Sequence, residues 1–218
     1  MSVKGHFALL IAEDNSYYVD DLLEFQNFLL SELYLDPSRV KIVSSSDGAH
    51  IFEQTKSFFE NLKRDGHIDD VVILYSGYGY KGGFSPRKNA LSYEEWGRLI
   101  DNEGSFFFIN DSCYSGSAIK AFKKLGLLPE KGLVISSSSE NEESLGGLSD
   151  ALMECYRNRE VFRIKRFEGE GIVSRIIDPR FIDNATGGYK TRHRTINIIH
   201  HPQRAGKALD YLLFKNKY

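Results

Sequence analysis

The chain has 218 residues and a formal net charge of −2, because 28 Lys and Arg residues face 30 Asp and Glu residues. With 41% hydrophobic and 13% aromatic residues it can build a buried core, which excludes a generally disordered chain. No apolar run reaches the ~20 residues that a membrane helix needs, and the two cysteines match neither a disulfide scaffold nor a zinc site. Since the first residues lack the apolar run of a secretory signal, we expect a cytoplasmic protein.

Charge is distributed unevenly along the chain. Residues 1–155 carry 14 basic and 24 acidic side chains, a net charge of −10, whereas residues 156–218 carry 14 basic and 6 acidic ones, a net charge of +8. A basic end of this kind can bind nucleic acid or an acidic partner. The apolar runs within it favour the alternative, in which the extension 156–218 packs against the acidic domain 1–155 and completes the same fold.

Short apolar runs and amphipathic segments alternate through the first 155 residues. In chain order they predict a strand at 6–12, a helix at 19–34, a strand at 40–44, a helix at 49–64, a strand at 71–75, a helix from a capping box at 92 to about 100, a strand at 106–110, a helix at 117–125, a strand at 132–136 and a helix at 148–156. This alternation predicts an α/β fold with a mostly parallel sheet and helices on both faces.

The extension has weaker patterns. Residues 161–167, 172–177 and 195–199 resemble strands, and 183–188 has the composition of a loop. Residues 206–214 are compatible with a closing helix or strand.

Ligands of an open α/β sheet bind beyond the carboxyl ends of its strands, which here are followed by segments 13–21, 44–48, 76–83, 111–116 and 136–147. Gly77, Gly79 and Gly82 have the G-x-G-x-x-G spacing of a dinucleotide loop. The residues that follow, 81–86, end in proline and cannot open a helix, so we predict no such cofactor. A glycine-rich loop also permits the close backbone approach that an oxyanion site requires.

Cys113 follows the predicted strand at 106–110 and precedes a predicted helix. A helix N-terminus lowers the pKa of a nearby thiol, so this cysteine is a candidate nucleophile, with a buried structural role as the alternative. Cys155 lies among apolar residues of the last predicted helix and is expected to be a small core residue.

Two segments carry a family resemblance. Residues 75–79 read Tyr-Ser-Gly-Tyr-Gly and residues 110–116 read Asn-Asp-Ser-Cys-Tyr-Ser-Gly, each directly after a predicted strand. This resembles the caspase-like cysteine peptidases (metacaspases, legumains and gingipains), which carry Ser-Gly-His-Gly and Asp-Ser-Cys-His-Ser-Gly-like loops at these places. The resemblance extends over about residues 5–155, with weaker support from residues 142–144 and 201–203. It implies a caspase-like three-layer sandwich.

The resemblance also implies roles for individual residues. Cys113 falls on the nucleophile, and its N–H with that of Gly79 would form the oxyanion hole. Asp111 falls on the metacaspase residue that binds a basic side chain before the scissile bond, although a helix cap or loop hydrogen bond explains an aspartate there equally well. Further acidic residues follow the first strand and favour a basic substrate residue: Asp14, Asp20 and Asp21. Metacaspases also allow a calcium requirement.

The catalytic histidine of the family falls on Tyr78 in this chain. A phenol titrates near pH 10 and is no general base at pH 7, and loss of such a group costs about 10²–10⁴-fold in rate. His50 follows a strand on the correct edge, whereas His6 and His67 lie at the opposite edge; the remaining histidines are in the extension: His193, His200 and His201.

Three functions are therefore open. The first is a cysteine endopeptidase, active or weakly active, that cleaves a peptide after a basic residue through Cys113. The second is an inactive caspase-like pseudoenzyme that binds a peptide or protein partner. The third is a module that binds nucleic acid through the basic extension. Tyr78 is the residue that separates the first two.

Overall fold

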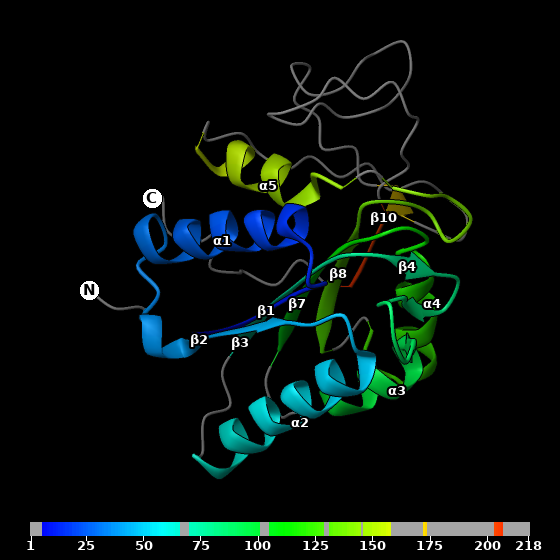
Figure 1. The fold of residues 1–218 in the computed structure, drawn as a ribbon, viewed down its shortest axis with the longest axis horizontal. Coiled ribbons are helices and arrows are strands. Elements are labelled where there is room, and N and C mark those ends of the chain that lie inside the picture. The colour runs from blue at the N-terminus through cyan, green and yellow to red at the C-terminus, as the bar shows by residue number, and fades with distance from the viewer. Residues whose placement is uncertain are drawn as a thin grey trace.

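The computed structural model describes residues 6–65, 70–100, 105–128, 131–144, 146–157, 172–173 and 203–206. All five predicted strands are present and parallel, as the core of one sheet (Figure 1). They are β1 (His6–Ala12), β2 (Val40–Ser44), β3 (Asp70–Ser76), β7 (Phe106–Asp111) and β8 (Gly132–Ser136). Their order is β2-β1-β3-β7-β8, so the chain changes direction across the sheet between β1 and β3. A crevice at the carboxyl ends of these two strands is where an open α/β sheet binds ligands.

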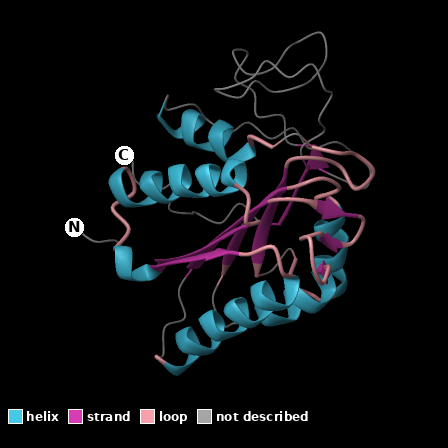
Figure 2. Ribbon diagram, in the orientation of Figure 1, coloured by secondary structure: helices cyan, strands magenta, loops and turns pink. Residues whose placement is uncertain are grey.

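Helices cover both faces of the sheet, which gives three layers (Figure 2). One face carries α1 (Ser16–Ser31) and α5 (Leu148–Arg157), and the other carries α2 (Gly48–Arg64), α3 (Tyr93–Gly97) and α4 (Ser117–Lys124). Two short 3₁₀ turns complete the described helices: η1 (Pro37–Arg39) before β2, and η2 (Arg98–Ile100) after α3. The prediction of an α/β fold with helices on both faces is confirmed.

Alternating side chains explain the two layers of core. In β3, Val72 and Leu74 pack beneath α1 and α5, whereas Val71, Ile73 and Tyr75 pack against the other helices. A strand buried on both faces reads as an unbroken apolar run, and this is why its position was predictable. The ends of α1 were less predictable: the helix begins at Ser16, because the Asn15 side chain accepts a hydrogen bond from the Tyr17 N–H.

A small antiparallel sheet was missed by the sequence patterns. It consists of β4 (Gly79–Tyr80), β5 (Gly83–Phe84) and β6 (Leu91–Ser92), each only two residues long. Strands this short carry no periodic signal. The sheet nevertheless fixes the glycine-rich loop, because the buried ring of Phe84 packs at 4.0 Å from the Tyr75 ring and 5.0 Å from the Trp96 ring (centroid distances).

Two short pieces of the basic extension belong to the main sheet. β10 (Gln203–Gly206) pairs antiparallel with β8, and β9 (Ile172–Val173) pairs antiparallel with β10. The strand expected at 172–177 is thus described for its first two residues, and Gly206 ends β10. The expectations for 161–167, 183–188, 195–199 and 207–214 lie outside the described residues. Within the described helices, none combines the length and the apolar character needed to cross a membrane.

The Trp96 indole provides a test of how the second layer packs onto the sheet. Its Nε1–H donates to Thr55 Oγ1 at 3.1 Å in a fully buried contact between α3 and α2. Thr55→Val leaves that donor unpaired at nearly unchanged volume, and this should cost about 1–3 kcal/mol of unfolding free energy. Urea unfolding followed by tryptophan fluorescence should show the loss. Thr55→Ser keeps the hydroxyl and is the control; equal stability of the valine variant and the wild type would contradict this account of the contact.

Candidate functional site

The carboxyl ends of β1, β3 and β7 meet at one edge of the sheet. The Glu13 N–H donates to the Ser76 carbonyl at 3.0 Å, and the Gly77 N–H donates to the Asp111 carbonyl at 3.4 Å. Pairing continues beyond the strands, so the loops that follow them start from a shared, fixed platform. Three of the segments predicted to face a ligand are therefore brought together: 13–21, 76–83 and 111–116.

Gly79 packs directly against the loop that carries Cys113. A Cβ on Gly79 would collide with the Cys113 carbonyl oxygen and would lie 2.7 Å from Ser112 Oγ. Only glycine permits this approach. The structure therefore places the two residues that the family resemblance assigns to an oxyanion hole side by side.

Cys113 is half-buried, and its sulfur faces the backbone of Ser144. Sγ donates to the Ser144 carbonyl and accepts from the Ser144 N–H, both at 3.4 Å. Burial raises the pKa of the thiol, and the charges of Glu143 and Asp111 raise it further. The expectation of a lowered thiol pKa is therefore wrong. The α4 N-terminus begins only at Ser117, and burial with two nearby carboxylates outweighs it.

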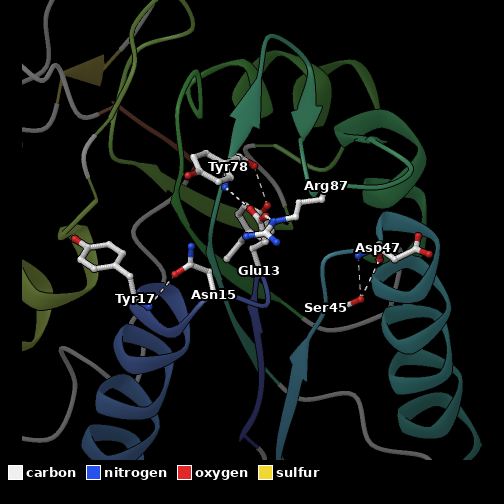
Figure 3. A network of polar contacts seen from close by, with 8 residues as sticks. Glu13, Asn15, Tyr17, Ser45, Asp47, Tyr78 and Arg87 are labelled. Atoms are coloured by element: carbon white, nitrogen blue, oxygen red, sulfur yellow. Dashed lines mark hydrogen bonds and ion pairs between the residues drawn. The ribbon is translucent and has the colours of Figure 1, made fainter.

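Tyr78, the residue on which the family resemblance places a histidine, is an anchored residue with an exposed ring. Its N–H donates to Glu13 Oε2 at 3.4 Å, and its carbonyl accepts from the Tyr75 hydroxyl at 2.8 Å (Figure 3). Half of Tyr78 is exposed to solvent. Its ring meets the ring of Tyr18 edge to face, with 5.5 Å between centroids. Burial first, and then Tyr78 through its charge and a hydrogen bond, raise the pKa of the Tyr18 phenol.

Glu13 is a buried carboxyl beneath the Tyr78 loop. Burial raises its pKa, opposed by the Tyr78 N–H and by the charge of Arg87, whose Nε lies 3.7 Å from Glu13 Oε1. Sequence reasoning placed Glu13 in a ligand-facing segment but assigned it no role. Its position directly after a buried strand was the available signal, whereas its burial depends on the loop of β3 folding over it.

No histidine lies beside Cys113 among the residues that the structure describes. His6 begins β1, at the opposite edge of the sheet, with its Nδ1 3.8 Å from Asp70 Oδ2. His50 lies in the first turn of α2, next to β2, and β2 is three strands away from β7. At ~4.8 Å per strand this is ~14 Å across the sheet, too far for proton transfer from Cys113. His67 and the three histidines of the extension lie outside the described residues.

A pair of acidic groups, the buried Asp111 and the part-buried Asp21, lies next to the cysteine loop. Asp111, only 2% exposed, accepts the Leu148 N–H on Oδ2 at 2.7 Å, while its Oδ1 has no hydrogen-bond partner among the described residues. Burial raises its pKa to about 6. Asp21 accepts the Ser76 hydroxyl at 3.1 Å, and burial together with the charges of Asp111 and Asp150 raises its pKa to about 7.

The structure separates the predicted acidic residues. Asp21 faces Asp111, whereas Asp14 and Asp20 are exposed to solvent. Asp150 of α5 joins the pair through its charge, which the sequence did not indicate. Asp111 also has the capping role that was its alternative, since it holds the first N–H of α5. Cys155 lies in α5, but its side chain is outside the described residues.

The acidic pair has no cationic side chain as partner in the described ranges. Nor do these ranges hold a group of three or more His, Cys, Asp or Glu side chains placed to bind a metal ion. The chain matches no protein-family model, and no curated protein is significantly similar to it in sequence.

The raised pKa values make the stability of the protein depend on pH. The folded-state pKa of Asp21 lies above its unfolded value of 3.8, so the folded state binds the extra proton and loses stability as pH rises through about 7. Asp21→Asn should therefore stabilise the protein at pH 8, by about 1–2 kcal/mol once partial solvent exposure is discounted, and should not do so at pH 4.

Thermal unfolding at both pH values measures this effect. A gain of 1 kcal/mol corresponds to about 2–4 °C in Tm for a chain of this size. Asp20→Asn, at the exposed neighbouring position, is the matched control and should change little. A stabilisation by Asp21→Asn that is equal at pH 4 and pH 8 would contradict the electrostatic explanation.

Proposed function

We propose that this chain is a caspase-like domain that binds a peptide segment through a basic side chain and does not cleave it efficiently. The observation that carries the proposal is the acidic pair of buried Asp111 and part-buried Asp21. Burial is the main cause of both raised pKa values, and neither carboxylate has a cationic side chain as partner among the described residues. Burying a carboxylate unpaired is costly, and a guanidinium or ammonium group would remove most of that cost.

The place of the pair supports a peptide as the ligand. Asp111 lies two residues before Cys113, and Ser76, which donates to Asp21, lies two residues before Tyr78, so the acidic pair lies beside the position where a caspase-like enzyme would hold the peptide bond. A basic side chain bound to this pair would lead the peptide backbone past Gly79 and Cys113. On this proposal the chain keeps the recognition half of a caspase-like site.

Among the described residues, no side chain beside Cys113 can act as the general base and acid that peptide hydrolysis requires. The thiol of Cys113 has a raised pKa, so at pH 7 it is protonated and weakly nucleophilic. Tyr78 replaces the imidazole that would take the thiol proton and return it to the leaving amine. Each of these two features slows hydrolysis, whereas neither weakens binding of a cation.

Binding should depend on the positive charge and on pH. The probe is acetyl-Ala-Ala-Arg-Ala-Ala-amide, compared with the same peptide carrying citrulline, a neutral isostere of arginine, by isothermal titration calorimetry. We expect at least tenfold tighter binding of the arginine peptide at pH 8. Its affinity should fall between pH 8 and pH 5.5, since Asp21 and Asp111 take up protons as pH falls through about 7 and 6.

Two variants test the site itself. Asp21→Asn should weaken binding of the arginine peptide at least tenfold, because one carboxylate of a buried ion pair is lost. Asp20→Asn should not. Asp111→Asn also removes a cap from α5, so Asp21→Asn is the decisive variant. Equal affinities for the arginine and citrulline peptides would refute the proposal.

A second candidate function is a slow cysteine endopeptidase with the same preference for a basic residue. The contact of Gly79 with the Cys113 loop favours it, because that contact is what an oxyanion hole of two backbone N–H groups requires. For this function, the group that the site lacks is the general base that would take the proton from the Cys113 thiol.

Restoring the base distinguishes the two functions. Tyr78→His should raise the release of a fluorophore from an arginine amide about 10²-fold or more if the oxyanion hole is intact. Cys113→Ala in the same variant should abolish the gain. If the wild type releases the fluorophore and Tyr78→His does not change the rate, the protein is a peptidase with another base, and the pseudoenzyme proposal is contradicted. If neither protein releases the fluorophore, the second candidate function is contradicted.

A further inference from the structure

Three tyrosines form a continuous aromatic strip beside the cleft. The rings of Tyr17 and Tyr18 meet edge to face at 5.4 Å, and the ring of Tyr18 meets that of Tyr78 in the same way at 5.5 Å (centroid distances). Tyr17 is 43% exposed and Tyr78 is 50% exposed, and both are among the few large hydrophobic side chains that the described surface exposes to this degree. Below, Tyr17, Tyr18 and Tyr78 are called the tyrosine strip.

The backbone beneath the strip is held firmly. The Tyr78 N–H is bonded to buried Glu13, and its carbonyl is bonded to the fully buried Tyr75 hydroxyl. Tyr17 and Tyr18 lie in the first turn of α1. Figure 3 shows Tyr17 directly after the Asn15 cap, whose side chain accepts the Tyr17 N–H. A tyrosine has only two side-chain torsions, so a ring on a fixed backbone loses little entropy when a ligand covers it. Fixed, half-exposed tyrosines are typical of residues that dominate peptide and protein binding.

The strip adjoins the acidic pair. Tyr17 and Tyr18 precede Asp21 by four and three residues on the same helix, and residues at these spacings share one helix face. The ring contact between Tyr18 and Tyr78 joins this helix face to the loop that follows β3. The strip therefore runs from the helix face of Asp21 to the loop that carries Tyr78.

We propose that the tyrosine strip binds an aromatic or large apolar side chain two residues before or after the basic residue of the ligand. The proposal rests on the function proposed above and extends it to the sequence that the cleft selects. Asp21 and Asp111 attract the cation, and the ring faces bury the neighbouring side chain. Tyr78 thereby acts as a binding residue at the position where the family keeps a catalytic one.

The acidic pair and the tyrosine strip each favour a different kind of ligand side chain. Asp111 Oδ1 is buried without a hydrogen-bond partner among the described residues, and one guanidinium could pair with Asp111 and Asp21 together. The exposed ring surface of the strip favours a second aromatic ring, which it can contact edge to face or stacked. Adjacent side chains of an extended peptide point to opposite faces, and every second side chain lies on the same face about 6.6 Å along the backbone, so a residue two positions from arginine reaches the strip while arginine remains at the acidic pair.

The experiment uses the full chain and three peptides. Acetyl-Ala-Ala-Arg-Ala-Ala-amide is the reference, and phenylalanine replaces the first or the last alanine, two residues from the arginine, in the other two. We expect one of the two phenylalanine peptides to bind about fivefold to twentyfold more tightly than the reference. Tyr17→Ala and Tyr78→Ala should abolish this gain, while Tyr78→Phe, which keeps the ring and loses only the hydroxyl, should retain it.

Leu23→Ala is the matched control. Leu23 is 42% exposed on α1, like Tyr17, but six residues turn the helix by about 240° and place it on another side. It should leave all three affinities unchanged. If the reference peptide binds but phenylalanine adds nothing, or the gain survives Tyr17→Ala, this inference fails and the proposed function stands. If the reference peptide does not bind at all, both are overturned.

Discussion

Negative charge buried at the carboxyl ends of β1, β3 and β7 is the constraint on which the cleft depends. Asp111 ends β7, Glu13 follows β1, and α1 brings Asp21 to Ser76 at the same edge of the sheet. Helices cover both faces of this sheet, so solvent cannot screen these carboxyl groups fully. Only Glu13 has a described cationic partner, Arg87. The carboxyls of the other two respond by holding protons at pH values where an exposed aspartate is ionised. A bound cation would release those protons, and this links recognition, pH and stability through the same two side chains.

The same negative charge disfavours the thiolate form of Cys113, which is the nucleophilic form. Burial and the charges of Glu143 and Asp111 oppose ionisation of Cys113, and no histidine lies beside it among the described residues to balance a thiolate. The proposed binding function needs only the acidic pair and a surface beside it. The half-exposed ring of Tyr78, anchored at both its N–H and its carbonyl, is the surface that the proposal assigns to this role.

Local patterns predicted most of the fold, because strands buried on both faces and long amphipathic helices carry strong signals in one dimension. β1, β2 and β8 were predicted to the residue. The helix start at Ser16 and the two-residue strands of the small sheet were not, since they depend on a capping contact and on Phe84 finding its aromatic cluster. Within the site, the proximity of Gly79 and Cys113 followed from motif and topology, whereas Glu13, Asp150 and Tyr18 had no signal strong enough to single them out.

The sequence by itself determined the order of strands and helices, the positions of Cys113, Asp111 and Tyr78 after particular strands, and the excess of acid in the first 155 residues. These are properties of neighbours along the chain. Tertiary structure alone decided which carboxylates are buried and which are exposed, because Asp20 and Asp21 are adjacent in sequence yet only Asp21 turns toward Ser76 and Asp111. It also decided the sign of the thiol pKa shift, since desolvation and charge depend on every group packed around Cys113 and not on its own segment.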